Sequence, residues 1–423
     1  MTEDFLHYLW QHKLYYSNDL VLTNGEKLQI ISSGVKNTDG GPDFSNARIV
    51  IGNVEWAGNI EIHINASDWK KHNHQADAAY DNVILHIVYE NDLIIKRKSG
   101  EEIPTFVLKN RFNETMFERY FDFINAKRWI PCELMIKDIE RFHFEMWLER
   151  MLIERLETKT NNIQKHLSQN VNNWEQTFYE QIASSFGFKV NSVAFECLAK
   201  SLPISIIGKH KNSLFQIEAL LFGQAGMLNK DFKDEYPQKL KTEYQFLQKK
   251  YDLKPISYQL WKFLRLRPAN FPTIRIAQLA SLIHQSSGLF SKLINSNTIL
   301  ELKSYFNIES SEYWHHHYSF DKQSRVISHS LGETSINLII INTIIPFMYL
   351  YGKYYDNESF TKKSLSFNDL LPAEDNVIIR NFKQLSINTS TAFRSQALLQ
   401  MKKEYCDKKR CLDCAIGNLL IKK

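Results

Sequence analysis

Glycine and proline are scarce in this chain, which has 15 Gly and 10 Pro among 423 residues. An all-β protein needs many tight turns, so this composition argues against one and favours a helix-rich fold. The five cysteines are too few for a disulfide framework, which indicates a reducing, cytoplasmic location. The length predicts two or three domains.

Long apolar runs are also missing, because no segment reaches 18 uninterrupted apolar residues. The longest candidate, residues 336–348 (INLIIINTIIPFM), is broken by Asn342, Thr343 and Pro346. We expect it to be a buried helix, and we expect no membrane span. The first residues, MTEDFLHYLW, are acidic and lack the basic region of a secretory signal, so we expect none.

The charges are distributed unevenly along the chain. Residues 1–110 hold 10 Lys/Arg and 15 Asp/Glu, about −5, and the remaining 42 and 32 give residues 111–423 about +10. This asymmetry is typical of an acidic, metal-binding front and a basic body that follows a polyanion such as nucleic acid. Ordinary variation between domains explains it equally well.

The hydrophobic pattern changes near residue 110. Before it, residues 4–15 have helical spacing, and alternating or continuous apolar runs follow. The predicted strands are 27–32, 47–51, 56–64 and 83–89, with 93–96 and 105–108 as a pair of outer strands. We therefore predict a mixed α/β domain over residues 1–110.

After residue 110 the pattern is helical, with few breakers. We predict an α+β protein in which a large all-helical domain, residues 111–423, follows the first domain and ends in a cysteine-rich tail. It has room for two subdomains divided near 230–255. The predicted helices are 139–163, 174–186, 193–200, 214–228, 236–251, 274–283, 335–345 and 390–405.

The densest polar constellation lies in the first domain. Asp43 follows a Gly-Gly-Pro turn at the start of a predicted strand, and Glu61-Ile-His63 places two polar side chains on one face of another. His72, His74, Asp77 and His86 follow within 25 residues of Glu61. Ionisable groups gathered in this way are typical of a functional site, although each residue taken alone is explained by turns, ion pairs or solvation.

Asp43 and Glu61-x-His63 lie in a predicted order of elements that runs helix, three strands, helix and strand. This motif and this order resemble the PD-(D/E)xK, restriction-endonuclease-like nucleases. The resemblance implies that Asp43 and Glu61 hold Mg²⁺ or Mn²⁺ and that the ion activates water for phosphodiester cleavage in DNA or RNA. His63 stands where the family has Lys and would assist the water. All three residues are candidate catalytic groups.

Two other interpretations remain open. The first assigns His63, His72, His74, Asp77 and His86 as candidate ligands of Zn²⁺ or Mn²⁺ in a hydrolase of small molecules. Alternatively, the fold is a non-catalytic module that binds nucleic acid or a protein. The sequence does not determine the oligomeric state.

The C-terminus carries a second constellation, Cys406-x₄-Cys411-x₂-Cys414. Three cysteines within nine residues suit a metal, and Cys132 is the best candidate for the fourth ligand. The arrangement resembles the iron–sulfur staple of some nucleases, and Zn²⁺ fits equally well. Reduced thiols without a metal are the alternative. Cys197 lies on an apolar helix face and is expected in the core.

Two further segments stand out. Arg265, Arg267 and Arg275 surround an aromatic, proline-rich stretch and form a candidate nucleic-acid contact. A rigid loop whose arginines bind carboxylates is the slightly favoured alternative. Residues 314–318 (WHHHY) are expected to form a packed aromatic turn.

The whole chain also resembles a bacterial family known as domain of unknown function 2851, which implies a shared fold and no particular activity. The segments that carry this resemblance are Gly41-Pro42-Asp43-Phe44, Gly58-Asn59-Ile60-Glu61-Ile62-His63, Asp68-Trp69 with His72, His74, Asp77 and Tyr80, Leu85-His86, Phe222-Gly223-Gln224-Ala225-Gly226, Arg265-Leu266-Arg267-Pro268, Asn270-Phe271-Pro272, Trp314 with His317-Tyr318, and the terminal cysteines.

Overall fold

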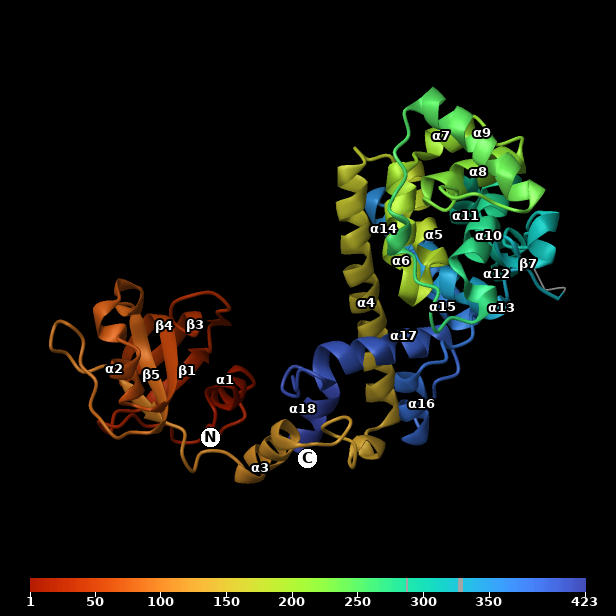
Figure 1. Cartoon of the computed structure of the whole chain (residues 1–423). Helices are drawn as coiled ribbons and strands as arrows, with labels where there is room; N and C mark the ends of the chain where they lie inside the picture. The colour runs from red at the N-terminus through yellow and green to blue at the C-terminus, as the bar shows by residue number, and fades with distance from the viewer. Residues whose placement is uncertain (287, 326–329) are drawn as a thin grey trace. The chain divides into compact units, whose positions relative to one another are not determined.

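The structure is a computed structural model that describes residues 1–286, 288–325 and 330–423 (Figure 1). The chain forms two compact units. Unit 1 comprises Met1–Trp147 and Lys402–Lys423, and unit 2 comprises Leu148–Met401. The division therefore lies at residue 147 where the sequence pattern placed it near 110, and the C-terminal segment belongs to the first unit.

Unit 1 contains a six-stranded sheet with the strand order β1-β3-β4-β5-β6, and β2 pairs with the first two residues of β3. The helix α1 (Glu3–Gln11) precedes the sheet. The strands are β1 (Leu28–Ser32), β2 (Val35–Lys36), β3 (Phe44–Ile51), β4 (Val54–Asn65), β5 (Val83–Glu90) and β6 (Thr105–Val107).

β3 and β4 form an antiparallel hairpin whose turn includes Gly52, with a φ of +59° that suits glycine. β4 then pairs with β5 in parallel. The crossover between them contains α2 (Asp68–Lys71), η1 (His74–Ala76) and η2 (Ala78–Tyr80). The chain thus runs helix, three main strands, a short helical crossover and a parallel strand.

The prediction that residues 93–96 and 105–108 pair with each other was wrong. Thr105–Val107 forms β6 and pairs in parallel with β5. Residues 93–96 contribute only the bridge between Lys96 and Glu102. The reason is that β5 is covered on both faces and needs a neighbour along its free edge, which the apolar β6 supplies.

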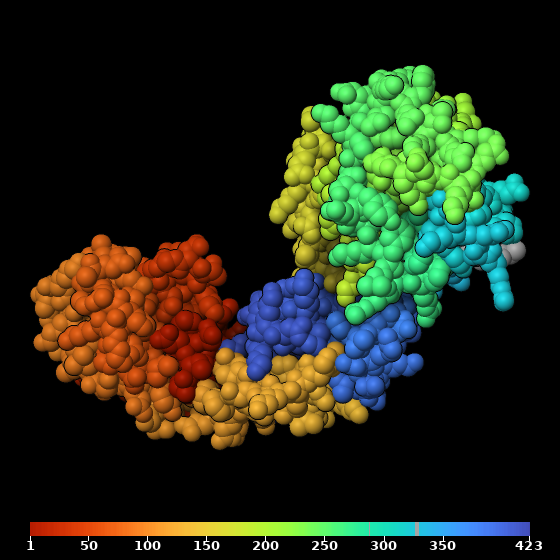
Figure 2. Space-filling view, in the orientation of Figure 1, coloured from red at the N-terminus to blue at the C-terminus, as the bar shows by residue number. Residues whose placement is uncertain are grey.

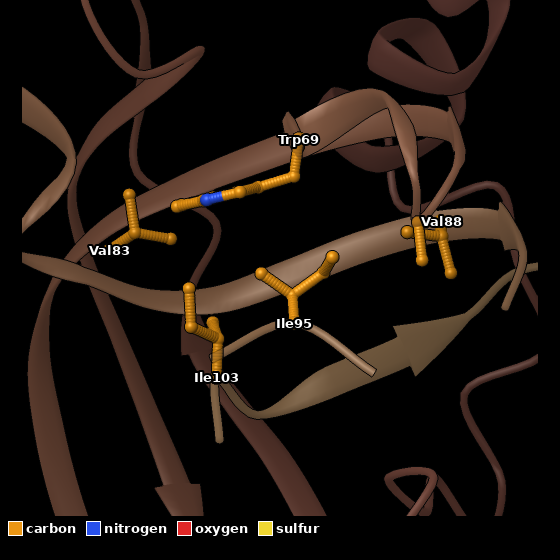
Figure 3. Close-up of a cluster of buried hydrophobic side chains, with 6 residues drawn as sticks. Trp69, Val83, Val88, Ile95 and Ile103 are labelled. Carbon is orange, nitrogen blue, oxygen red and sulfur yellow. The ribbon is translucent and has the colours of Figure 1, made fainter. Parts of the chain in front are cut away.

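A hydrophobic cluster fixes the crossover against the sheet (Figure 3). Trp69 from α2 is 3% exposed and packs with the valines and isoleucines that surround β5. Gly58 allows β4 and β5 to approach, because a Cβ there would lie 2.5 Å from a methyl group of Ile84. The cluster consists of Ala66, Trp69, Val83, Val88, Ile95 and Ile103.

Helices from the two sequence segments of unit 1 pack against one another. In α3 (Glu114–Asn125), Tyr120 stacks on Phe5 of α1 with ring centroids 5.4 Å apart. α18 (Ala415–Lys422) packs on α3, and Arg119 donates a hydrogen bond to the carbonyl of Ile421. Figure 2 shows the C-terminal residues, in blue, lying against the orange-yellow segment that contains α3. This contact holds the C-terminal segment within unit 1.

Unit 2 is helical, and α10 (Pro272–Gln285) lies at its centre, with residues Pro272–Ile283 buried. α10 packs on α5 (Trp174–Phe186) and α8 (Leu214–Gln224). The other helices are α4 (Arg141–Gln169), whose first turns belong to unit 1, α6 (Phe188–Ser201), α7 (Ile204–Gly208), α9 (Glu235–Tyr251), α11 (Leu289–Asn295), α12 (Ile299–Ser304), α13 (Glu333–Ile339), α14 (Ile345–Tyr354), α15 (Glu358–Leu370), α16 (Val377–Gln384) and α17 (Ala392–Met401).

Two details of unit 2 bear on the predictions. It is not entirely helical, because β7 (His317–Ser319) and β8 (Lys322–Gln323) form a short antiparallel pair beside the buried Trp314. The apolar segment Glu333–Tyr354 is long enough to cross a membrane by length and composition, but 72% of its apolar window is buried within the protein. This degree of burial is typical of a helix in the core of a protein.

Candidate metal centre

Glu61, His63 and His86 lie side by side on the sheet. Glu61 and His63 are two residues apart on β4, so they share one face, and Glu61 is the register partner of His86 on β5. These side chains are almost fully buried, with exposures of 5%, 1% and 0%. Ionisable groups in such surroundings need partners, since an unpaired buried polar group is costly.

The crossover adds two more histidines to this group. One nitrogen from each of His63, His72 and His74 lies within 4.8 Å of the other two. His72 is exposed, whereas the side chain of His74 is only 10% exposed. Tyr80 stacks on the His74 ring with centroids 3.8 Å apart, and the Trp69 ring lies edge-on to it at 5.4 Å. These aromatic contacts hold His74 over the sheet.

A single carboxylate oxygen faces two of the histidines. Glu61 Oε1 lies 3.1 Å from His74 Nε2 and 3.4 Å from His63 Nε2. Both Nε2 atoms are buried and lack a hydrogen bond among the described residues. One oxygen and two ring nitrogens directed at the same small volume need a proton or a cation between them, because their lone pairs repel each other.

His86 orients the ring of His63. The distance from His63 Nδ1 to His86 Nε2 is 2.9 Å, so one of these nitrogens donates to the other. When His63 Nδ1 donates, His63 Nε2 keeps its lone pair for a metal ion. A metal-binding histidine almost always has such a partner on its second nitrogen. His86 therefore suits the role of an orienting residue.

Burial dominates the titration of the centre. It raises the pKa of Glu61, with a smaller contribution from the nearby carboxyl of Asp43, to about 9. It lowers the pKa of His63 to about 3, with an additional effect from His86. The pKa of His74 is also lowered, mainly by burial. Near neutral pH and without metal, the imidazole of His63 is thus neutral and the carboxyl of Glu61 is protonated.

Asp43 and Glu61 are joined through the backbone of the two strands. The backbone N–H of Asp43 donates to Glu61 Oε2 at 3.1 Å, and the N–H of Ile62 donates to Asp43 Oδ2 at 2.9 Å. Asp43 Oδ2 also lies 3.1 Å from Nε2 of His7 on α1. This reciprocal pair places the carboxyl of Asp43, with 24% of its side chain exposed, directly beside the histidine centre.

The helix α1 supplies residues that the sequence analysis did not select. His7 is the partner of Asp43, and Glu3 is close enough to His72, Asp43 and His7 to interact with them electrostatically. The amphipathic pattern of residues 4–15 predicted the helix, but it gave no sign that its polar residues face the sheet. Asp77, in contrast, accepts a hydrogen bond from the N–H of Ala79 at the start of η2 and lies outside the three-histidine group.

A pocket of about 230 Å³ opens beside the centre, and His74 forms part of its wall. Trp69 and Tyr80 supply aromatic surface. Three consecutive basic residues, Lys96, Arg97 and Lys98, line the same pocket. Arg97 is held in place, since its guanidinium donates to the carbonyls of Asp81 at 3.0 Å and Val83 at 2.6 Å. Asp81 also lines the pocket, so three basic residues and one carboxylate give it an excess of positive charge that suits an anionic ligand.

The three candidate arginines of unit 2 differ in their exposure to solvent. Arg265 and Arg267 are exposed, whereas Arg275 is only 6% exposed and lies over the ring of Phe188 at 4.6 Å. Arg275 donates to the side-chain oxygens of Asn270 at 2.6 Å and Gln278 at 2.9 Å. Burial lowers its pKa to about 10. Arg275 is therefore a structural residue of the α10 region, and a nucleic-acid contact by Arg265 and Arg267 stays a prediction.

The four cysteines Cys132, Cys406, Cys411 and Cys414 all fall in unit 1 and are free thiols. Cys197, on α6 of unit 2, is also free.

Comparison with known proteins gives one match. A family profile described as "Protein of unknown function (DUF2851)" matches residues 3–377. The chain belongs to the DUF2851 family. No curated protein and no solved structure matches it. The DUF2851 match includes the whole histidine centre and Cys132, and it ends before the three C-terminal cysteines.

Proposed function

We propose that unit 1 of this DUF2851 protein is a metal-dependent hydrolase that cleaves phosphodiester bonds of nucleic acid. The observation that carries the proposal is the approach of Glu61 Oε1 to His63 Nε2 and His74 Nε2, at 3.4 and 3.1 Å, with no hydrogen bond to either nitrogen among the described residues. A divalent cation resolves this arrangement, because all three atoms become ligands.

The donor set favours one class of cation. Imidazole nitrogens suit Zn²⁺ and other transition metals, and Mn²⁺ accepts both carboxylate and imidazole ligands. Mg²⁺ prefers oxygen ligands and keeps several waters. We therefore propose Mn²⁺ or Zn²⁺ held by Glu61, His63 and His74, with the exposed His72 as a further ligand. His63 then binds the metal itself, in place of the water-activating role that its position suggested.

The ion would supply the chemistry that such hydrolases need. A bound divalent ion would lower the pKa of a water ligand and would polarise the phosphate. The Asp43–His7 pair is placed to accept the proton of the attacking water, since Asp43 adjoins Glu61 and remains partly exposed. His86 orients His63 through its second nitrogen.

The pocket beside His74 supports a phosphate-containing substrate. Lys96, Arg97 and Lys98 would attract the anionic backbone, and the rings of Trp69 and Tyr80 offer surface for a base. The order of elements in unit 1 also resembles that of the restriction-endonuclease-like core, with Asp43 just before one hairpin strand and Glu61 in the next. These features support a nuclease of that type.

A test uses the full chain, purified free of metal and supplied with Mn²⁺, Zn²⁺ or Mg²⁺. Single-stranded and double-stranded DNA and RNA are the substrates. We expect cleavage with Mn²⁺ or Zn²⁺ that is lost in Glu61→Gln and His74→Ala. His143→Ala is the matched control, because His143 lies on α4 with 46% of its side chain exposed. Absence of cleavage in every condition, or equal cleavage by all variants, would contradict the proposal.

The size of the pocket favours a second candidate, a phosphodiesterase of small molecules. A volume of about 230 Å³ matches a single nucleotide better than a duplex. Nucleotide phosphodiesters assayed beside the polymers distinguish the two. Cleavage of the small esters alone supports the second candidate, and metal binding without any cleavage indicates a non-catalytic module.

A further inference from the structure

The cysteine cluster, defined as Cys132, Cys406, Cys411 and Cys414, is assembled from two segments that are far apart in the sequence. The loop after α3 carries Cys132, and the C-terminal segment carries the other three. Lys409 of the C-terminal segment donates to the carbonyl of Ile124, at the end of α3, at 2.5 Å. Lys402 Nζ lies 5.1 Å from the ring centroid of Trp129. Two independent contacts thus bring these segments together.

The four thiols form one buried group. Cys132, Cys411 and Cys414 have exposures of 9%, 7% and 7%. Each thiol interacts electrostatically with the other three. Buried thiols gathered from two segments offer the sulfur ligands that a soft metal centre binds.

The spacing of the thiols argues against a single ion. Four sulfurs at about 2.3 Å from one zinc ion lie roughly 3.8 Å apart at the corners of a tetrahedron. Among the described residues, the histidine group has three ligand atoms within 4.8 Å of one another, and no three of the cysteines meet this distance. The cysteine cluster is more widely spaced. An iron–sulfur cluster separates its ligands by its own width, since each thiolate binds a different corner.

The surroundings suit a negatively charged centre. Arg128, Lys402 and Lys409 each stabilise the thiolate form of one cysteine, Cys132, Cys406 and Cys411 respectively.

The fourth thiol, Cys414, stands at the N-terminus of α18, where the backbone N–H groups of Ile416 and Gly417 donate to its sulfur. Gly417 is required for this packing, because a Cβ there would lie 2.3 Å from the carbonyl oxygen of Cys411. N–H groups and cations around thiolates are typical determinants of iron–sulfur sites.

We propose that the cysteine cluster binds an iron–sulfur cluster. Four sulfur–iron bonds form, and each thiol releases its proton to solvent as its sulfur binds. The cluster joins the segment after α3 to the C-terminal segment. The proposal does not depend on the hydrolase activity, because none of the four cysteines belongs to the histidine centre.

The test begins with the full chain purified without oxygen. We expect iron and acid-labile sulfide in equal amounts, a broad visible absorption that dithionite bleaches, and an electron paramagnetic resonance signal after reduction. If the isolated protein is colourless, anaerobic incubation with ferrous iron, ferric iron and sulfide must restore these properties. Stoichiometric zinc at the cysteines, or protein that takes up no iron and sulfide on incubation, would overturn the proposal.

Two cysteine variants test whether the visible absorption and the iron come from the cysteine cluster. Cys414→Ser should lose the absorption and the iron, whereas Cys197→Ser should keep both, since Cys197 lies on α6 in unit 2. Retention of the full signal in Cys414→Ser, or its loss in Cys197→Ser, would contradict the assignment. Because Cys414→Ser could fail to fold, the resonance signal of the unmodified chain serves as a readout that needs no variant.

Discussion

The histidine centre and the cysteine cluster belong to the same unit but are built in different ways. The three-histidine group and Glu61 come from one continuous stretch, residues 61–74, and a parallel strand adds His86. The cysteine cluster joins two segments that are more than 270 residues apart. The first needs only local folding of the sheet and its crossover, whereas the second requires the end of the chain to return to the first unit.

This contrast predicts different consequences for metal removal. The histidine centre lies on a sheet that a separate hydrophobic cluster around Trp69 already holds, so its metal should add chemistry more than stability. The cysteine cluster joins two segments that are distant in the sequence, in addition to the packing of α18 on α3, so its metal should stabilise the fold. The predictions below concern the histidine centre, and the iron content of the cysteine cluster serves as an internal control.

The largest effect is expected for His74→Ala, which removes a proposed ligand. Affinity for Mn²⁺ should fall by at least about 100-fold, because few ligands remain. Iron bound to the cysteine cluster should not change. Titration calorimetry with Mn²⁺ and an iron assay measure the two effects on one sample. Equal Mn²⁺ affinity in His74→Ala and in the control His143→Ala would show that the histidine centre is not the binding site.

Metal affinity should also depend strongly on pH. The pKa of Glu61, about 9 without metal, means that binding displaces one proton at neutral pH, whereas His63, with a pKa of about 3, is already neutral. Affinity for Mn²⁺ should therefore rise about tenfold per pH unit near neutral pH, and by about 50-fold between pH 7 and 9, because the rise levels off near the pKa. The same titration of Glu61→Gln should lose this dependence. A flat profile for the unmodified chain would contradict the proposed ligand role of Glu61.

The orienting role of His86 predicts an intermediate effect. His86→Phe keeps an aromatic ring in the buried position and removes the partner of His63 Nδ1. Loss of such a partner typically lowers metal affinity by about 10- to 100-fold. Calorimetry measures the change, and circular dichroism checks the fold. Unchanged affinity in a folded variant would argue that the contact between the two histidines serves packing alone.

The smallest effect concerns stability. The raised pKa of Glu61 means that its carboxyl takes up a proton on folding between pH 4.5 and about 9. The contribution of Glu61 to the free energy of unfolding is greatest below pH 4.5 and is lost as the pH rises toward 9. Glu61→Gln avoids this loss, so the Tm of the metal-free variant at pH 8 should be higher by about 2–4 °C. A Tm of Glu61→Gln below that of the unmodified chain at pH 8 would contradict the claim that burial raises the pKa of Glu61.

Several features could be predicted from the sequence because they follow local rules. Period-two alternation placed Glu61 and His63 on one face, and the turn at Gly52 predicted the hairpin between β3 and β4. The change from strand to helical periodicity predicted the α+β class. These patterns depend on neighbours in sequence, so the sequence contains the information directly.

Other features depend on tertiary contacts. The role of His7 requires the orientation of α1 against the sheet, and the basic lining of the pocket requires the course of residues 96–98. The burial of Arg275 follows from the packing of α10 on its neighbours, which its spacing from Arg265 did not indicate. The return of the C-terminal segment to unit 1 has no local signature other than the cysteines themselves.

The most direct test of the central claim is anomalous X-ray diffraction from crystals of the full chain grown with Mn²⁺. The account predicts one strong manganese peak in unit 1, bounded by Nε2 of His63, Nε2 of His74 and a carboxylate oxygen of Glu61. Manganese sites only elsewhere in the crystal, with the two imidazoles and the carboxyl group bonded directly to one another, would contradict it.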